Sequence, residues 1–344
     1  RQGWFLPVTP GTKHVTVGGA IANDVHGKNH HHRGTFGSHL RSLELMRSDG
    51  SRQHCSARSN PLLFAATIGG MGLTGVITSA ELQLMRVESA YVDQEVIRFD
   101  RLADFFRLAR ESDAGSEYSV AWIDQLARGR SLGRGLLIRG NHAREGGLRA
   151  ARAGRLRLAV PFELPFSVLN RASIRAFNAV HLRKEGRRHS RRRVALDPFF
   201  YPLDGIADWN RLYGPKGLHQ HQSVVPLGVA ETAITEMLER TQAAGLASFL
   251  TVLKVFGDRP SPGLLSFPRP GATLTLDFPN TGSRVLALLD ELDRVTISAG
   301  GAVNPYKDAR MGPEVFEASF PRWRELLAHR DGRLCSDFWR RVTG

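Results

Sequence analysis

The sequence predicts an α+β protein with two domains. The chain has 344 residues, of which 42% are hydrophobic, and this length is enough for two well-buried cores. In its second half, strand-like runs alternate with helix-like runs in the order strand–helix–strand, strand–helix. That order is typical of an antiparallel sheet with helices on one face. No apolar run of about 18 residues occurs, so the sequence predicts no transmembrane helix.

Two short elements are predicted early in the chain from their turn and cap residues. Residues 42–57 alternate around the pair Asp49-Gly50 and predict a hairpin. Residues 60–68 predict a helix that has Asn60 as its cap and Pro61 at its first position.

Four glycines between residues 69 and 75 have the look of a dinucleotide-binding fingerprint. They follow the helix predicted at 60–68 and precede a strand predicted at 76–85. This is the reverse of the strand-to-helix order that such a fingerprint needs, so an NAD-type Rossmann site is not expected. A glycine-lined surface for a flat cofactor stays open.

The elements of the second half follow from the alternation of apolar and polar residues. Residues 141–198 are basic and are expected to be irregular around an apolar patch at 161–166. The pattern predicts strands at 91–99, 119–124, 248–256 and 272–278, and helices at 101–112, 228–244 and 283–298.

The chain is strongly basic, with a formal net charge of +14. Such a field attracts nucleic acid, anionic lipid or a phosphorylated substrate. Much of the excess lies in 183–193, with a second basic stretch at 144–157. Aromatic residues are not interleaved with these arginines and no nucleic-acid-binding motif occurs, so the charge favours a membrane surface or a lipid phosphate over nucleic acid.

Neither a disulfide framework nor a metal site is expected. Cys55 and Cys335 are the two cysteines, too few for a framework, and this number fits a reducing compartment. The histidines at 26 and 30–32 lack the neighbouring cysteines or carboxylates that would complete a tetrahedral site.

The segment 15–31 carries the strongest functional signal. Its β-branched residues 15–17 predict a strand that stops at Gly18-Gly19, where a helix begins. Glycine lets backbone N–H groups approach a large cofactor closely, because it has no side chain and tolerates positive φ. His26 and Lys28 follow at once, and titratable groups beside a cofactor platform predict an active site.

Lysine is scarce in this chain, with six lysines against 41 arginines. Lysine has a compact amine whose pKa the protein can shift, whereas the arginine guanidinium stays charged. The scarcity therefore points to Lys28, Lys254 and Lys307 as candidate functional residues.

Three strings near the N-terminus are specific enough to carry a family resemblance. They are Gly3-Trp4-Phe5-Leu6-Pro7-Val8-Thr9-Pro10-Gly11-Thr12, the run 15–22 and His26-Gly27-Lys28-Asn29-His30-His31. They resemble flavoenzymes of the vanillyl-alcohol-oxidase type, which bind FAD in a PCMH-type domain. The likeness is weakest over 141–190 and continues at 67–77, 121–122, 200–214, 220–226, 254–257, 277–279, 307–308 and 336–337.

The resemblance implies a domain organisation. Residues 1–88 and 302–344 would form the FAD-binding domain, and 89–301 the substrate domain, with the basic segment 141–198 as an insertion. In the family a further segment precedes this region and carries the loop around the FAD pyrophosphate. The FAD-binding domain is therefore expected to be incomplete at its N-terminus.

The resemblance also implies site residues. Lys307 and His26 are expected to be catalytic, because an alcohol must lose its O–H proton as hydride leaves its carbon. Gln220 and Gln222 share one face of a strand, where they would hydrogen-bond sugar hydroxyls or form an ordinary polar face. The positions that match FAD contacts are Gly11, Thr16, Val17, Gly18, Gly19, Asn23, His26, Ile77 and Asn304. Those that match substrate contacts are Lys28, Trp122, Phe200, Gln220, Gln222, Lys254, Phe256, Thr273 and Thr275.

The implied reaction is the oxidation of a sugar hydroxyl. The substrate would be a polyprenylphosphoryl ribose similar to decaprenylphosphoryl-β-D-ribose, oxidised at its 2′-hydroxyl to a ketone in cell-wall arabinan biosynthesis. An NAD(P)-dependent reductase partner would complete the epimerisation. A lipid-linked phosphopentose implies a location in the cytoplasm or peripheral to the membrane, its periplasmic face included.

Several positions depart from the family pattern and leave alternatives open. Thr275 replaces a cysteine, Thr273 an asparagine, Phe200 and Asn304 a tyrosine each, and Val120 a serine. The changes remove polar contacts around the sugar and favour, as an alternative, another FAD-linked sugar or aldonolactone oxidase. An inactive fragment without cofactor and a basic nucleic-acid-binding protein are the remaining hypotheses.

Overall fold

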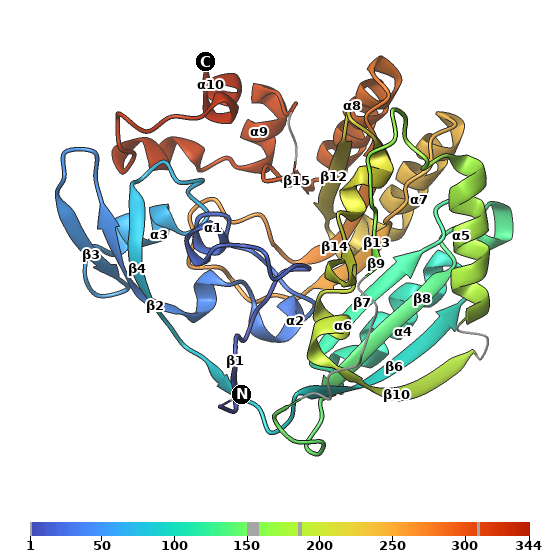
Figure 1. Ribbon diagram of the computed structural model, residues 1–344. Helices are drawn as coiled ribbons and strands as arrows, with labels where there is room; N and C mark the ends of the chain where they lie inside the picture. The colour runs from blue at the N-terminus through green and yellow to red at the C-terminus, as the bar shows by residue number, and fades with distance from the viewer. Residues whose placement is uncertain (1, 150–157, 185–187, 308–309) are drawn as a thin grey trace. The chain divides into compact units, whose positions relative to one another are not determined.

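The computed structural model describes residues 2–149, 158–184, 188–307 and 310–344, and its contacts divide the chain into two units (Figure 1). Unit 1 contains Arg1–Gly3, Val87–Val255 and Gly271–Asp308. Unit 2 contains Trp4–Arg86, Phe256–Pro270 and Ala309–Gly344. These units group two site-bearing segments differently from the expected domains: 256–270 belongs to unit 2 with the N- and C-terminal segments, and 302–307, which contains Asn304 and Lys307, belongs to unit 1.

Unit 1 is built on an eight-stranded sheet in the order β10-β6-β8-β7-β13-β14-β12-β15. The pairings with a described register are antiparallel, as the sequence predicted. The strands are β6 (Tyr91–Phe99), β7 (Tyr118–Ile123), β8 (Gly135–His142), β10 (His189–Ala195), β12 (Leu218–Val225), β13 (Val252–Phe256), β14 (Gly271–Pro279) and β15 (Ala302–Val303).

One face of this sheet packs on α4 (Leu102–Asp113), α7 (Leu227–Ala243) and α8 (Ser283–Ser298) around the main core. In α8 the buried residues Val285, Leu288, Leu292 and Val295 recur every three or four positions, so they form one apolar stripe. Leu274 and Leu276 of β14 meet this core from the sheet. The predicted helix at 283–298 is confirmed.

The opposite face of the sheet also carries a helix, which corrects the expectation of helices on one face. Leu182 of α5 (Arg171–Lys184) packs with Trp122, Val96 and Leu136 in a separate cluster. The expectation that 141–198 is irregular was wrong for α5 and for β10, because a helical run and an edge strand form there. The rest of this segment includes 150–157 and 185–187, which lie outside the described residues.

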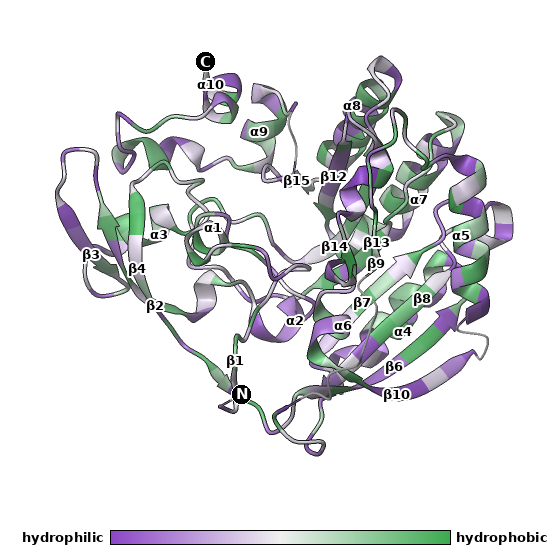
Figure 2. Ribbon diagram, in the orientation of Figure 1, coloured by the Kyte–Doolittle hydropathy of each residue, from purple (hydrophilic) through white to green (hydrophobic). Residues whose placement is uncertain are grey.

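Some arginines of the basic run that contains β10 pair with carboxylates of unit 1. Figure 2 shows β10 as a mainly hydrophilic strand, a common property of sheet edges. Arg191 and Arg193 pair with Glu95 and Asp93 of β6 at 2.7 Å. Although burial raises the pKa of Glu95, hydrogen bonds from Arg191, Arg139 and His189 outweigh it and lower that pKa to about 2. These arginines therefore have internal partners and are not solely a surface for a polyanion.

Unit 2 contains a three-stranded sheet, β3-β2-β4, formed by β2 (Leu40–Met46), β3 (Arg52–Ser56) and β4 (Val76–Leu82). The predicted hairpin is confirmed, with Gly50 at φ 85° in its turn. The helix α3 (Pro61–Thr67) is confirmed as well, with Pro61 in its first turn. The short helix α1 (Val17–Ala22) contacts β4, and unit 2 also contains α2 (His30–Arg33), α9 (Pro313–Ser319) and α10 (Asp337–Thr343).

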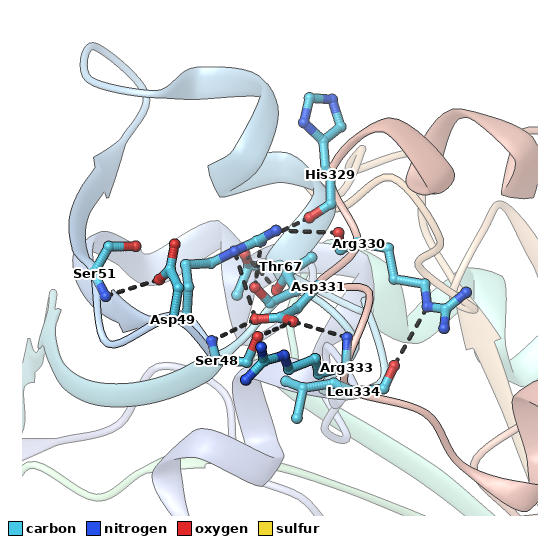
Figure 3. Close-up of polar contacts among 11 residues, drawn as sticks. Ser48, Asp49, Ser51, Thr67, His329, Arg330, Asp331, Arg333 and Leu334 are labelled. Carbon is cyan, nitrogen blue, oxygen red and sulfur yellow. Dashed lines mark hydrogen bonds and ion pairs between the residues drawn. The ribbon is translucent and has the colours of Figure 1, made fainter.

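A polar cluster ties the C-terminal segment of unit 2 to the hairpin of β2 and β3 (Figure 3). The Arg47 guanidinium donates to the carbonyl groups of Thr74, His329 and Arg330 at 2.5, 2.8 and 3.1 Å. Asp331 accepts from the backbone N–H and hydroxyl of Ser48 at 2.7 and 2.6 Å. These bonds lower the pKa of Asp331 to about 2. Its contribution to stability is therefore complete above about pH 4 and is lost as the pH falls through about 2.

In the part of the chain that the structure describes, no helix is both long and apolar enough to cross a membrane.

We expect Arg47→Ala to lower the free energy of unfolding by about 2–4 kcal/mol, because three carbonyl groups lose their donor and the Asp331 carboxylate loses an ion-pair partner at 3.7 Å. Thermal unfolding at neutral pH measures the loss. Arg41→Ala is the control, since the ion pair of Arg41 with Glu81 is 60% and 62% exposed on its two sides. Equal melting temperatures for the two variants would contradict the role given to the cluster.

Candidate active site

The glycine pair of the segment 15–31 lies inside α1 and not in a turn. Val15 and Thr16 form no strand, and neither Gly18 nor Gly19 has a positive φ, so this part of the prediction was wrong. The Thr16 hydroxyl caps the helix by accepting from the Gly19 N–H at 3.0 Å. The backbone N–H of Gly19 is thus used within the protein. Asn23 closes the helix, with its N–H donating to the Gly19 carbonyl.

The absence of a side chain at Gly11 and Gly18 leaves open space. A Cβ at Gly11 would meet nothing within 4 Å, and one at Gly18 would meet only the Ile77 Cβ at 4.0 Å. Neither position needs glycine for its φ or its packing. Val17 is 51% exposed beside Gly18, so the surface here is apolar and free of side-chain bulk. Such a surface suits a flat aromatic ligand.

Gly27, between His26 and Lys28, is required for close packing. A Cβ there would lie 2.9 Å from the Thr9 carbonyl oxygen and 2.9 Å from Asn29 Oδ1. Contacts this short require glycine, because a backbone oxygen cannot move aside. The side chain of Asn29 donates to the Pro7 carbonyl at 2.8 Å. The resemblance-bearing strings 3–12 and 26–31 are therefore packed together.

His26 lies in an aromatic group within unit 2. Its ring meets Phe256 edge-on at 4.7 Å and Phe267 at 6.2 Å, and His30 also contacts Phe256, at 4.6 Å. The structure thus brings together His26 and Phe256, which were predicted from segments 230 positions apart in the sequence. Among the described residues no group of three or more His, Cys, Asp or Glu side chains could hold a metal ion.

The amine of Lys28 is matched to proton exchange at neutral pH. Burial lowers the pKa of Lys28 to about 7. An amine with this pKa is present in both its neutral and its ammonium form at pH 7, and so can take up or release a proton there.

Asp24 was not predicted, and it anchors the segment that carries Phe256. Its buried carboxylate accepts the Gly37 N–H at 2.8 Å and the Ser266 hydroxyl at 2.5 Å, and also the Ser261 hydroxyl. Burial raises the pKa of Asp24, against the effect of these hydrogen bonds. An aspartate two positions before a histidine carries no sequence signal for such a role.

In unit 1 the predicted substrate residues share one face of the sheet. Strand pairing places Gln220 opposite Asp277, Gln222 opposite Thr275 and Val224 opposite Thr273. Their neighbours along β14 belong to the main core, so these side chains point to the other face. Lys254 and Trp122 point the same way, because Leu253 and Ala121 beside them are in that core. We call Gln220, Gln222, Lys254, Thr273, Thr275 and Asp277 the polar face.

The side chain of Gln222 forms a bridge within the polar face. Its Nε2 donates to Thr273 Oγ1 at 3.1 Å, and its Oε1 accepts from Asn304 Nδ2 at 2.8 Å. The Asn304 Oδ1 in turn accepts the Tyr306 N–H at 3.0 Å. Gln222 and Asn304 are thus engaged with each other, which the sequence did not indicate.

Gln220 forms a second bridge, and it includes Lys307. Lys307 Nζ donates to Gln220 Oε1 at 2.5 Å, while Gln220 Nε2 donates to Asp277 Oδ1 at 2.6 Å. Each of these amide atoms thus has one partner within the protein, and the expectation that both glutamines hydrogen-bond sugar hydroxyls stays a prediction.

Trp122 and Phe200 are enclosed by other aromatic rings. Trp122 is 8% exposed, and His181 of α5 meets its ring edge-on at 4.7 Å. Phe200, at the end of α6 (Leu196–Phe200), is 2% exposed and packs against Tyr118 at 4.8 Å. Phe200 therefore stabilises this side of the sheet rather than presenting its ring to water.

Comparison with known proteins identifies the family. A model described as "FAD binding domain" matches residues 1–56. Decaprenylphosphoryl-beta-D-ribose oxidase of Mycolicibacterium smegmatis is 36% identical over 358 residues, which cover 99% of this chain and 76% of that protein. The chain belongs to the decaprenylphosphoryl-β-D-ribose oxidase family. The protein is therefore an FAD-dependent oxidoreductase, and both the expected cofactor and the family resemblance are confirmed.

Two further proteins are similar to this chain. An uncharacterized protein from the mprA 5′ region of Streptomyces coelicolor is 36% identical over 356 residues, covering 99% of this chain and 96% of that protein. A D-arabinono-1,4-lactone oxidase of Yarrowia lipolytica is 32% identical over 125 residues, covering 36% of this chain and 22% of its own.

The residues around α1 fit the FAD of this oxidase family. At Gly18 a Cβ would meet only the Ile77 Cβ, at 4.0 Å, so the missing side chain leaves a cradle that alanine would begin to fill. We expect Gly18→Ala to stabilise the cofactor-free chain by about 0.5–1 kcal/mol, because alanine favours a helix interior over glycine. It should at the same time reduce FAD retention, as the methyl group occupies the cradle. Thermal unfolding and the flavin absorbance of the purified protein measure the two effects.

Gly27→Ala is the matched variant for that comparison. Its Cβ clashes with the Thr9 backbone, so it should lose stability and FAD together. An unchanged flavin content in Gly18→Ala would rule out the cradle.

We also expect Lys28→Met to raise the melting temperature, and to raise it most below pH 7. The ammonium form is disfavoured in the folded state, where the pKa of Lys28 is about 7, relative to about 10.4 in the unfolded chain. That cost is fully present below pH 7 and disappears as the pH rises towards about 10. Melting curves at pH 6 and pH 10 test this, with the exposed Lys216→Met as control. A gain that is equal at both pH values would contradict it.

Proposed function

We propose that this protein oxidises the 2′-hydroxyl of a polyprenylphosphoryl ribose, such as decaprenylphosphoryl-β-D-ribose, to the 2′-keto sugar. The observation that carries the proposal is the polar face, where Lys254 and the two glutamines lie on one side of the sheet and Gln220 accepts a hydrogen bond from Lys307. The printed activity of the Mycolicibacterium smegmatis relative supports the same substrate class.

The cofactor and the substrate are assigned to different residues. FAD, when bound, supplies the acceptor for the hydride that leaves the sugar carbon. We assign its contacts to Gly11, Thr16, Val17, Gly18, Gly19, Asn23, His26, Ile77 and Asn304. The substrate contacts are assigned to the polar face apart from Asp277, together with Lys28, Trp122 and Phe256.

We assign proton transfer to Lys28, Lys307 and His26. An alcohol loses its O–H proton as its carbon loses hydride, and a group that accepts a proton near neutral pH serves that step. Burial lowers the pKa of Lys28 to about 7 and lowers that of Lys307 as well. Both amines therefore reach the neutral form more readily than an ordinary lysine does.

The proposed substrate carries a lipid phosphate, and this accounts for further features of the chain. Lys254 suits the phosphate as a point charge. The side chains of Phe162 and Phe166, 64% and 63% exposed, suit peripheral contact with a lipid surface that the basic net charge attracts. The keto product is a substrate for an NAD(P)-dependent reductase, which we propose as the partner that completes the epimerisation.

A second candidate is the oxidation of a free sugar or an aldonolactone. Thr273 and Thr275 favour it, because they replace an amide and a thiol of the family pattern on the polar face. The local similarity to a D-arabinono-1,4-lactone oxidase adds to this candidate.

We expect decaprenylphosphoryl ribose to bleach the visible absorbance of the FAD-loaded protein under anaerobic conditions, while free ribose and arabinono-1,4-lactone leave it unchanged. Stopped-flow absorbance measures the rate for each compound. Bleaching by the free sugar or the lactone alone would select the second candidate, and no bleaching by any of them would reject both.

The variant Lys307→Met completes this experiment. Its flavin content should stay normal, whereas bleaching by decaprenylphosphoryl ribose should slow by a factor of about 100 or more, as expected for loss of a proton-transfer group. Lys216→Met is the matched control on an exposed lysine.

A further inference from the structure

A buried carboxylate, Asp277, lies at the end of the Gln220 bridge opposite Lys307. Asp277 lies on β14 in register with Gln220 and is 0% exposed. Its Oδ1 accepts from Gln220 Nε2 at 2.6 Å. The same amide accepts from Lys307 Nζ at 2.5 Å through its Oε1. Three side chains thus form one hydrogen-bonded chain that ends at the amine assigned to proton transfer.

The direction of this hydrogen-bonded chain is determined by its two ends. An ammonium group only donates and an ionised carboxylate only accepts. The Gln220 amide must therefore turn its oxygen to Lys307 and its nitrogen to Asp277. In this orientation the amide dipole carries the negative polarity of Asp277 towards the amine.

The surroundings make Asp277 and Lys307 depend on each other. Burial raises the pKa of Asp277 to about 6, opposed by the Gln220 hydrogen bond, by the charge of Lys307 and by the Tyr213 phenol that faces it. Part of Lys307 reaches water, yet the protein around its amine lowers the pKa of that amine, and the charge of Asp277 opposes this. The charge on each group favours the charged form of the other.

We propose that Asp277 is a positioning residue for Lys307: through the Gln220 amide it holds the amine in place, and its negative charge favours the ammonium form. This inference rests on the proposed function at one point, namely that Lys307 takes part in proton transfer from the substrate hydroxyl. The groups that face the carboxylate are Gln220, Lys307 and Tyr213. Without Asp277 the amine would be held less firmly and would lose its proton at lower pH.

The test measures the protonation of Lys307 directly, in the chain without cofactor or substrate. Competitive acetylation with acetic anhydride is followed by mass spectrometry of the peptide that contains Lys307, with the exposed Lys216 as internal reference. Asp277→Asn keeps the shape and the acceptor oxygen but removes the charge. We expect it to increase the acetylation of Lys307 relative to Lys216 by about tenfold at pH 8, since one pKa unit is a factor of ten.

The control removes a buried carboxylate from the other face of the same sheet. Asp293 of α8 lies 3.1 Å from His221 Nε2, and both side chains are at most 2% exposed. Asp293→Asn should leave the acetylation of Lys307 unchanged, although it disturbs a buried pair beside Gln220. Asp277→Glu, which keeps the charge, should restore the normal rate. Equal rates in wild type and Asp277→Asn would overturn the proposal.

If Asp277→Asn does not fold, Gln220→Leu decides the question. It leaves the carboxylate in place and removes the bridge, so the acetylation of Lys307 should again rise. An unchanged or slower rate would show that Asp277 does not act through Gln220.

Flavin bleaching gives an independent readout. FAD-loaded Asp277→Asn should retain its flavin while the pH profile of bleaching shifts to lower pH. Because the labelling experiment needs no substrate, it tests the arrangement even where the proposed substrate fails.

Discussion

The register between β12 and β14 is the constraint on which the arrangement of unit 1 depends. It sets Gln220 against Asp277 and Gln222 against Thr275, while His221 and Leu276 between them face the helices. Because side chains alternate along a strand, a slip by one residue would move the polar face into the core of α7 and α8. The apolar residues of β14 that pack in that core therefore also determine which polar groups meet. Packing on one face thus specifies chemistry on the other.

Much of the fold could be predicted where one local signal dominates. The apolar stripe of α8, the Asp49-Gly50 turn and Pro61 at the start of α3 each depend on neighbours within a few residues, and each was confirmed. The strand expected at 15–17 was wrong, since β-branched residues were outweighed by the Thr16 cap of α1. The helix α5 was missed because the apolar residues Phe177 and Val180 are exposed and obscure the buried stripe of Ile174 and Leu182.

The residues of the candidate site could be predicted from the sequence, but the hydrogen bonds that join them could not. The resemblance placed Gln220, Gln222 and Lys307 near a substrate, and the structure places them on or beside one face of one sheet. That the glutamines act as bridges follows from hydrogen bonds that join residues 50 to 90 positions apart, which no local pattern encodes. Asp24 and Asp277 were not predicted for the same reason. The role of a buried carboxylate depends on its hydrogen-bond partners, which lie far away in the sequence.

The Arg47–Asp331 cluster has a consequence for how the chain is made. Arg47 leaves the ribosome 282 residues before His329, the carbonyl of which it binds. At roughly 5–20 residues per second, the hairpin of β2 and β3 waits on the order of 15–60 s for its C-terminal partner, while the strands of unit 1 are being synthesised. During that interval Arg47 and Ser48 lack the carbonyl and carboxylate groups that residues 329–331 supply. The hairpin is therefore tied to the C-terminal segment only near the end of synthesis.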